Sequence, residues 1–251
     1  MTALTGSSTA TQRPALLGQT VVVIGGSSGI GLATARSARA EGAETVLTGR
    51  DPERLRRAAD DVGARQHAAF DAHDPERLDA FFRSLATPVD HILVSAGNPY
   101  YAPLAEMDIA DACRYVADHV RLTLETARHA TRAVRPGGTL LLLSGTGARQ
   151  PAVGISVTAL LTAGVPALTA NLALELAPVR VNLIAPGFVD TPLSASLLGE
   201  DLDERRKQLR TALPIRRVVE PANIAALAVQ LMTNTALNGA TFDIDGGQQL
   251  I

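Results

Sequence analysis

Residues 21–31 of the chain are its most informative segment, and they read Val21-Val22-Val23-Ile24-Gly25-Gly26-Ser27-Ser28-Gly29-Ile30-Gly31. Its apolar half is typical of a strand buried on both faces, as in a parallel sheet. A glycine-rich turn and then a helix follow. Glycines let the backbone approach a pyrophosphate, and a helix N-terminus offers free N–H groups at the positive end of its dipole. The stretch therefore predicts a nucleotide-binding loop made by Gly25, Ser27, Ser28, Gly29, Ile30 and Gly31, with a simple tight turn as the alternative.

Beyond that loop, short apolar runs alternate with amphipathic segments. Strands are expected at 20–24, 45–48, 66–70, 91–94, 139–143, 179–184 and 241–244. Helices are expected at 30–41, 52–61, 74–85, 104–134, 157–177 and 221–232. This alternation predicts an α/β protein with a Rossmann-type, doubly wound parallel sheet in a single domain. Residues 1–15 are expected to form a flexible arm ahead of that domain, which spans 16–251.

Composition narrows the class of protein. The chain has 251 residues, 23 of them basic and 25 acidic, with no basic cluster, so we expect neither a nucleic-acid nor a membrane partner. A single cysteine, Cys113, cannot form an internal disulfide, which favours a reducing, cytoplasmic location. The apolar segment 157–177 includes several polar residues, so we expect it to be buried in protein rather than in a membrane. The histidines and the cysteine lack metal-site spacing, so no metal is expected.

Five segments stand in order along the chain: the glycine loop, Phe70-Asp71, the run 93–97, the segment 174–191 and the turn 243–247. From residue 16 onward, these segments resemble the short-chain dehydrogenase/reductase family. Some positions depart from the family pattern, because Ile24 replaces a threonine, Ala72 an acid, and Val94 and Ser95 two asparagines. The resemblance implies a nicotinamide cofactor whose further contacts are Asp71, Ala72, Ser95, Ala96, Gly97, Thr162, Pro186, Gly187, Val189 and Thr191.

The end of the second expected strand indicates which cofactor is bound. Dehydrogenases that select NAD place an acid there to bind the ribose 2′-hydroxyl, whereas this chain has Gly49 followed by Arg50. A guanidinium can bind a 2′-phosphate through two hydrogen bonds, and the missing carboxylate removes a repulsion. NADP is therefore favoured over NAD. In the alternative interpretation, Arg50 only pairs with Asp51 or Glu53 on the next helix.

The residues that usually carry the family's chemistry are missing. The resemblance implies a serine, a tyrosine and a lysine, and their positions fall on Gly145, Thr158 and Thr162. A threonine hydroxyl does not titrate near neutral pH and carries no positive charge, so two threonines cannot replace the tyrosine and lysine. The only lysine of the chain is Lys207, in a charged segment far from these positions. The standard mechanism is therefore not expected.

Other side chains could supply the missing proton. His119 falls near the position of a supporting asparagine, and imidazole titrates in the right range. Tyr100 and Tyr101 follow the fourth strand and could be donors or merely pocket walls, while Ser144 could orient a substrate oxygen. The catalytic candidates are Ser144, Thr158, Thr162 and His119.

Three functions fit these observations. The first is an NADP-dependent oxidoreductase of a small carbonyl or alcohol substrate that uses a non-standard proton donor. The second is an inactive cofactor-binding sensor or partner subunit, and the third is a non-redox enzyme in the same pocket. A homo-oligomer, dimer or tetramer, is expected through the 104–134 and 157–177 helices, because the second has scarcely any polar face. Residues 198–210 carry eight charges and predict a solvated helix or mobile flap.

Overall fold

The computed structural model describes residues 13–86 and 88–251 and contains one seven-stranded, fully parallel sheet. The strand order is β3-β2-β1-β4-β5-β6-β7, which is the doubly wound arrangement that the sequence predicted. The strands are β1 (Thr20–Ile24), β2 (Glu44–Gly49), β3 (Gln66–Ala69), β4 (Val89–Val94), β5 (Val134–Leu143), β6 (Arg180–Pro186) and β7 (Thr241–Ile244).

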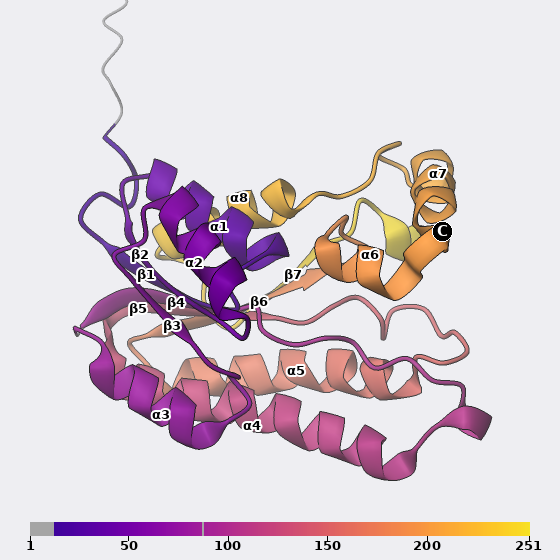
Figure 1. Cartoon of the computed structure of the whole chain (residues 1–251), viewed down its shortest axis with the longest axis horizontal. Coiled ribbons are helices and arrows are strands. Elements are labelled where there is room, and N and C mark those ends of the chain that lie inside the picture. Colours follow the sequence, from indigo (N-terminus) through magenta and orange to yellow (C-terminus); the bar gives the residue numbers. More distant parts are fainter. Residues whose placement is uncertain (1–12, 87) are drawn as a thin grey trace, which may run out of the picture.

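Helices cover both faces of this sheet (Figure 1). Helices α1 (Gly29–Ala40), α2 (Pro52–Val62) and α8 (Pro221–Thr233) lie on one face. Helices α3 (Pro75–Ser84), α4 (Ile109–Ala133) and α5 (Ser156–Glu175) lie on the other. The remaining helices are α6 (Pro192–Leu198), α7 (Leu202–Ala212) and the short 3-10 turns η1 (Leu104–Glu106), η2 (Gly199–Asp201) and η3 (Gln248–Leu250).

The first strand shows why continuous apolar runs predicted buried strands. Val21 and Val23 belong to the core beneath α1 and α8, whereas Val22 and Ile24 belong to the core beneath α4 and α5. All four side chains are fully buried. A strand between two helical layers needs apolar residues at every position, since neither face meets water.

Two helices begin at capping aspartates, and two boundaries differ from expectation. The Asp51 and Asp74 carboxylates accept hydrogen bonds from the first backbone N–H groups of α2 and α3. The expected helix 104–134 begins only at residue 109, because Asp108 caps it and the separate turn η1 precedes it. The fifth strand begins at residue 134, so the segment 135–138 lies inside the strand, with a shift in register, instead of separating it from the helix.

Helix α5 is apolar on both sides but buried on only one. It is the one helix in the described residues that is long and apolar enough to span a membrane, yet it packs on β6 and α4 as a core helix of the fold. Leu161 and Val165 are buried on its inner face, whereas Leu160 and Leu174 on the outer face are 62% and 79% exposed. Within a single chain, the expected cover on the second face is therefore missing.

The N-terminal boundary is only partly described. Residues 1–12 of the expected arm lie outside the described residues. The backbone N–H of Ala15 donates a hydrogen bond to the Glu41 carboxylate, and Leu16 is fully buried beside α1. The packed domain thus includes residue 16.

Candidate active site and cofactor cleft

The glycine loop lies where β1, β2 and β4 end, and two of its glycines are required by close packing. A Cβ on Gly31 would lie 2.2 Å from the Gly25 carbonyl oxygen, and a Cβ on Gly25 would lie 2.7 Å from the backbone nitrogen of Ala96. Gly25 also has a φ of +94°, which L-residues with side chains rarely adopt. The loop and the first turn of α1 line a cleft of about 200 Å³.

The N-terminus of α1 is open to an anion. Ser28 occupies the N-cap position, but its side chain forms no capping hydrogen bond, and the first turn of the helix contains no acidic residue. The first N–H groups of a helix lack partners within the helix and carry its positive partial charge. Because Ser28, Gly29, Ile30 and Gly31 all line the cleft, this end of the helix can receive a phosphate group.

Basic side chains surround the outer end of the cleft. Arg50, Arg54 and His73 line it, together with Asp71. Among the described residues Arg50 forms no ion pair, so the pairing with Asp51 or Glu53 considered above is not found. Asp51 instead caps α2, and the Glu53 carboxylate binds Arg56 at 3.2 Å.

The acid at the end of β3 is held by its neighbour. The backbone N–H of His73 donates to the Asp71 carboxylate, and the His73 ring nitrogen Nδ1 lies 3.0 Å from the same oxygen. Burial alone would raise the pKa of Asp71, but the hydrogen bonds from His73 and the charge of Arg50 lower it overall. Asp71 is therefore a carboxylate at neutral pH, and Ala72 beside it is buried.

Ser95 joins the end of β4 to the glycine turn. Its hydroxyl lies within hydrogen-bond distance of the Ile24 and Gly25 carbonyl oxygens, at 3.2 and 3.0 Å. Ser95, Ala96 and Gly97 line both the cleft and a larger cavity that continues from it. The two spaces thus meet at the end of β4.

The larger cavity has a volume of about 670 Å³ and brings the catalytic candidates together. Ser144, Thr158, Thr162 and His119 all line it, as do the tyrosines Tyr101 and Tyr115. The cofactor candidates that share this lining, besides those at the end of β4, are Ile30, Pro186, Gly187, Val189, Thr191 and Thr162. Tyr100 does not line it, and its hydroxyl donates instead to the Asp108 carbonyl.

Both threonine hydroxyls are already engaged with backbone. The Thr158 hydroxyl donates to the Tyr100 carbonyl oxygen at 2.6 Å and accepts from the Tyr100 N–H at 3.2 Å. It thereby ties α5 to the loop after β4. The Thr162 hydroxyl donates to the Ala159 carbonyl at 3.2 Å, and its side chain is buried. The Ser144 hydroxyl, in contrast, has no hydrogen-bond partner within residues 13–86 and 88–251, so it can turn toward a ligand.

His119 is the titratable side chain best placed in the cavity. Neither ring nitrogen bonds to another described residue, and the Nδ1 atom lies near Gly97, at the junction of cleft and cavity. Burial lowers the pKa of His119, and nearby His73 lowers it further. The ring is therefore mostly neutral at pH 7 and gains a proton only under more acidic conditions.

The tyrosines of the cavity have raised pKa values, which makes them weaker acids. Burial raises the pKa of Tyr115 to about 12 and also raises the pKa of Tyr101. A catalytic tyrosine needs the opposite shift, which a neighbouring positive charge provides. Neither phenol has a lysine partner, since the only lysine of the chain, Lys207, pairs with Glu204 on α7.

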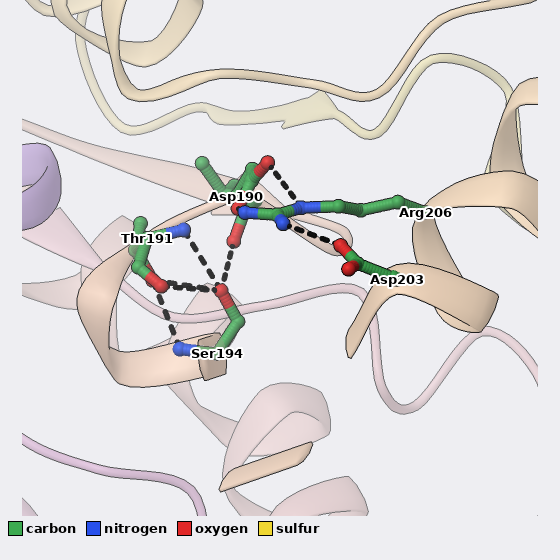
Figure 2. A network of polar contacts seen from close by, with 6 residues as sticks. Asp190, Thr191, Ser194, Asp203 and Arg206 are labelled. Atoms are coloured by element: carbon green, nitrogen blue, oxygen red, sulfur yellow. Dashed lines mark hydrogen bonds and ion pairs between the residues drawn. The ribbon is translucent and has the colours of Figure 1, made fainter. Parts of the chain in front are cut away.

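An ion-pair network joins α7, which carries Arg206, to Asp190 after β6 (Figure 2). The Arg206 guanidinium donates two hydrogen bonds of 2.8 Å to the Asp190 carboxylate and a third to Asp203. These contacts raise the pKa of Arg206. Next to Asp190, the Thr191 and Ser194 side chains form a capping box at the start of α6. The segment expected to be a solvated helix or a mobile flap thus contains a mostly exposed helix that is anchored to the loop after β6.

Sequence reasoning missed this anchor. Asp190 and Arg206 are 16 residues apart, on a loop and a helix, so no helical spacing links them. The high density of charged residues at 198–210 was visible in the sequence, but the contact between Arg206 and Asp190 was not. Within the described residues, no group of three or more His, Cys, Asp and Glu side chains could hold a metal ion.

Known proteins resemble the chain over nearly its full length. Residues 24–249 match the family described as enoyl-(acyl carrier protein) reductase. Dehydrogenase/reductase SDR family member 4 of Sus scrofa is 34% identical, over 94% of this chain and 89% of that protein. Short-chain dehydrogenase/reductase malC of Malbranchea aurantiaca is 27% identical, over 95% of this chain and 97% of that protein.

Solved structures agree with these sequence matches. The structure of the MalC reductase/Diels-Alderase from Malbranchea aurantiaca has a TM-score of 0.88 at 27% identity, covering 95% of this chain and 99% of that one. A short-chain dehydrogenase/reductase from Serratia marcescens has a TM-score of 0.85 at 28% identity, covering 94% and 99%. The chain is therefore a member of the short-chain dehydrogenase/reductase family, an oxidoreductase family that implies an NAD(P) cofactor.

Proposed function

We propose that the chain is an NADP(H)-dependent oxidoreductase of a small carbonyl or alcohol substrate, with a proton donor other than the family's tyrosine. The observation that carries this proposal is the junction of two spaces. An open helix N-terminus and a glycine cradle line the cleft, and the cleft continues into a cavity that contains an unengaged imidazole, His119.

NADP is proposed over NAD because the adenosine end of the cleft is basic. Arg50 and Arg54 line it, neither forms an ion pair among the described residues, and Gly49 stands where an NAD-selecting acid would be. Two unpaired guanidinium groups suit the 2′-phosphate of NADP. The Asp71 carboxylate lies beside them as the proposed partner of the adenine amino group.

The proposed cofactor contacts follow the lining of both spaces. They are Gly25, Ser27, Ser28, Gly29, Ile30, Gly31, Arg50, Asp71, Ala72, Ser95, Ala96, Gly97, Thr162, Pro186, Gly187, Val189 and Thr191. When bound, the nicotinamide supplies hydride chemistry. The side chains of this protein then have to hold the substrate oxygen and provide its proton.

His119 is the proposed proton donor, directly or through water. Thr158 and Thr162 are at the positions of the lost tyrosine and lysine, but their hydroxyls are bonded to backbone and are weak acids. Ser144, whose hydroxyl has no partner among the described residues, is proposed to orient the substrate oxygen. Since burial lowers the pKa of His119, carbonyl reduction should become faster as the pH falls below 7.

The test combines cofactor binding with turnover. We expect NADPH to bind more tightly than NADH, and an Arg50→Ala variant to lose that preference. NADPH-dependent reduction across a panel of small ketones and aldehydes should fall at least tenfold in His119→Ala, while Tyr100→Phe, which changes a side chain outside the cavity, should keep its rate. Stoichiometric NADPH binding with no turnover would replace the proposal by the sensor or partner-subunit function.

One comparison favours a second candidate function. The relative with a TM-score of 0.88 is described as both a reductase and a Diels-Alderase, so one member of this fold family combines redox with non-redox chemistry. A cavity of about 670 Å³ without the tyrosine–lysine pair suits a reaction that needs shape and few proton transfers. Product formation without consumption of NADPH would favour this function.

A homo-oligomer and a cytoplasmic location are part of the proposal. Leu160 and Leu174 on the outer face of α5 are largely exposed, and a second copy of the chain would cover them, together with α4. Sedimentation at micromolar concentration should give a dimer or tetramer. A monodisperse monomer would contradict this expectation.

A further inference from the structure

The cavity described above has a marked charge asymmetry. Of the ionisable side chains that line it, Arg149, Arg205 and His119 are basic, and none is an aspartate or glutamate. Much of the remaining lining is apolar, supplied by Leu143, Ile155, Leu161, Phe188, Leu193, Leu197 and Leu198. A ligand of this cavity therefore meets apolar surface and positive charge, but no negative charge.

The two arginines are not equivalent. Arg149 is neutralised, because its guanidinium forms two hydrogen bonds with the Asp243 carboxylate, at 2.9 and 3.2 Å. Arg205 forms neither an ion pair nor a hydrogen bond within residues 13–86 and 88–251. Its neighbours on α7 have other partners, since Glu204 pairs with Lys207 and Asp203 pairs with Arg206. Arg205 is thus the cation of the cavity that still lacks a counter-charge.

The helix that carries Arg205 is held in place by the adjacent residue. Arg206 binds Asp190 through two 2.8 Å hydrogen bonds (Figure 2). Leu209 is buried against Leu213 and Val218. The first contact fixes the helix to the loop after β6, and the second packs it against the segment that follows the helix. The helix backbone that carries Arg205 is thus fixed before a ligand arrives, which reduces the entropy lost on binding.

We propose that Arg205 binds an anionic group, most simply a carboxylate, on a substrate whose remaining body is apolar, and that Arg206 positions it. This proposal rests on the proposed function, because it names the class of substrate for the same cavity. A guanidinium and a carboxylate form a paired, charge-assisted contact, and a partly shielded site strengthens it. The carbonyl to be reduced would lie near Ser144 and His119, which line the same cavity.

A matched pair of ligands tests the proposal without relying on turnover. The probes are 4-oxo-4-phenylbutanoate and its methyl ester, which share an apolar ring and a ketone and differ in one negative charge. Binding to the full-length protein is measured by calorimetry, with and without NADPH. We expect the acid to bind at least tenfold more tightly than the ester, which is the typical size of one charge-assisted contact of about 1.4 kcal/mol.

Variants identify the residue responsible. Arg205→Gln should abolish the preference for the acid while leaving the affinity for the ester unchanged. Arg206→Gln should reduce the preference, because the helix loses its anchor. Arg210→Gln removes the same charge from an exposed position on the same helix outside the cavity, and should leave the preference intact. Circular dichroism confirms that each variant is folded.

The outcomes separate this proposal from the proposed function. Equal binding of acid and ester, binding of neither, or a preference that survives in Arg205→Gln would overturn the role of Arg205 while leaving NADPH binding intact. Loss of the preference in Arg210→Gln as well would show a general charge effect and would also overturn it. If NADPH fails to bind but the acid preference depends on Arg205, the oxidoreductase proposal falls and the anion site stands.

Discussion

Replacement of one buried arginine should destabilise the whole domain. Arg180, at the start of β6, is 6% exposed and has no carboxylate partner among the described residues. Its guanidinium donates to the carbonyl oxygens of Leu231 and Met232, both at 2.8 Å, at the end of α8, and to the Thr139 hydroxyl at 2.7 Å. Further hydrogen bonds of 3.1 Å reach the carbonyls of residues 234 and 237.

The size of the effect follows from these contacts. Arg180→Met fills a similar volume but leaves several buried carbonyls at the negative end of α8 without donors. Breaking a buried charged network typically costs about 3–5 kcal/mol. For a chain of this size each kcal/mol shifts the Tm by about 2–4 °C, so the Tm should fall by about 10 °C.

Thermal and urea unfolding, followed by circular dichroism, measure this loss. The control is Arg132→Met, at an exposed position on α4, which should change the free energy of unfolding by less than about 0.5 kcal/mol. Arg180→Lys keeps the positive charge but has fewer hydrogen-bond donors, so its Tm should lie between those of the wild type and Arg180→Met. If Arg180→Met unfolds like its control, the guanidinium does not stabilise the end of α8 and the reasoning is wrong.

Three further predictions concern pH, the glycine cradle and the loop tether. Burial lowers the pKa of His91 to about 3, so below pH 6.5 this side chain binds a proton in the unfolded chain but not in the folded one. The free energy of unfolding should therefore fall with pH below about 6.5, by up to about 1.4 kcal/mol per pH unit between pH 6 and 5. Urea unfolding checks this, and a His91→Gln variant with the same slope would disprove it. Gly31→Ala should abolish NADPH binding, seen by calorimetry, because its Cβ would meet the Gly25 carbonyl, whereas Gly164→Ala on the open side of α5 should leave binding intact; equal affinities would refute the cradle. Thr158→Val should speed proteolysis of the loop at 97–103, since two hydrogen bonds are lost, and unchanged cleavage would argue against the tether.

The sheet could be read from the sequence because each strand carries its own signal. The run at 21–24 is apolar at every position, and proline after Asp51 marks a helix start, so local residues determine these elements. The end of α4 was less clear, because the segment 135–138 looks like a break but lies within β5, as an irregularity between the residues that pair with β4. The glycines of this segment fit both a turn between two elements and an irregular part of a strand. Only the contacts with the neighbouring strand distinguish the two.

The candidate site was harder to predict than the fold. The family resemblance put His119 and Ser144 at or beside expected catalytic positions, and both line the cavity. It did not show that the Thr158 hydroxyl is bonded to Tyr100, nor that Arg206 reaches Asp190, because these contacts join segments that are distant in sequence. Contacts of this kind depend on side-chain geometry rather than on periodicity.

The bond between Thr158 and Tyr100 has a consequence for protein engineering. Installing tyrosine at position 158 and lysine at position 162, where the family resemblance would place the usual pair, would also cut the tether between α5 and the loop after β4. A variant redesigned in this way would have a less rigid cavity wall. A successful graft would therefore need a second substitution that gives the Tyr100 backbone a new partner.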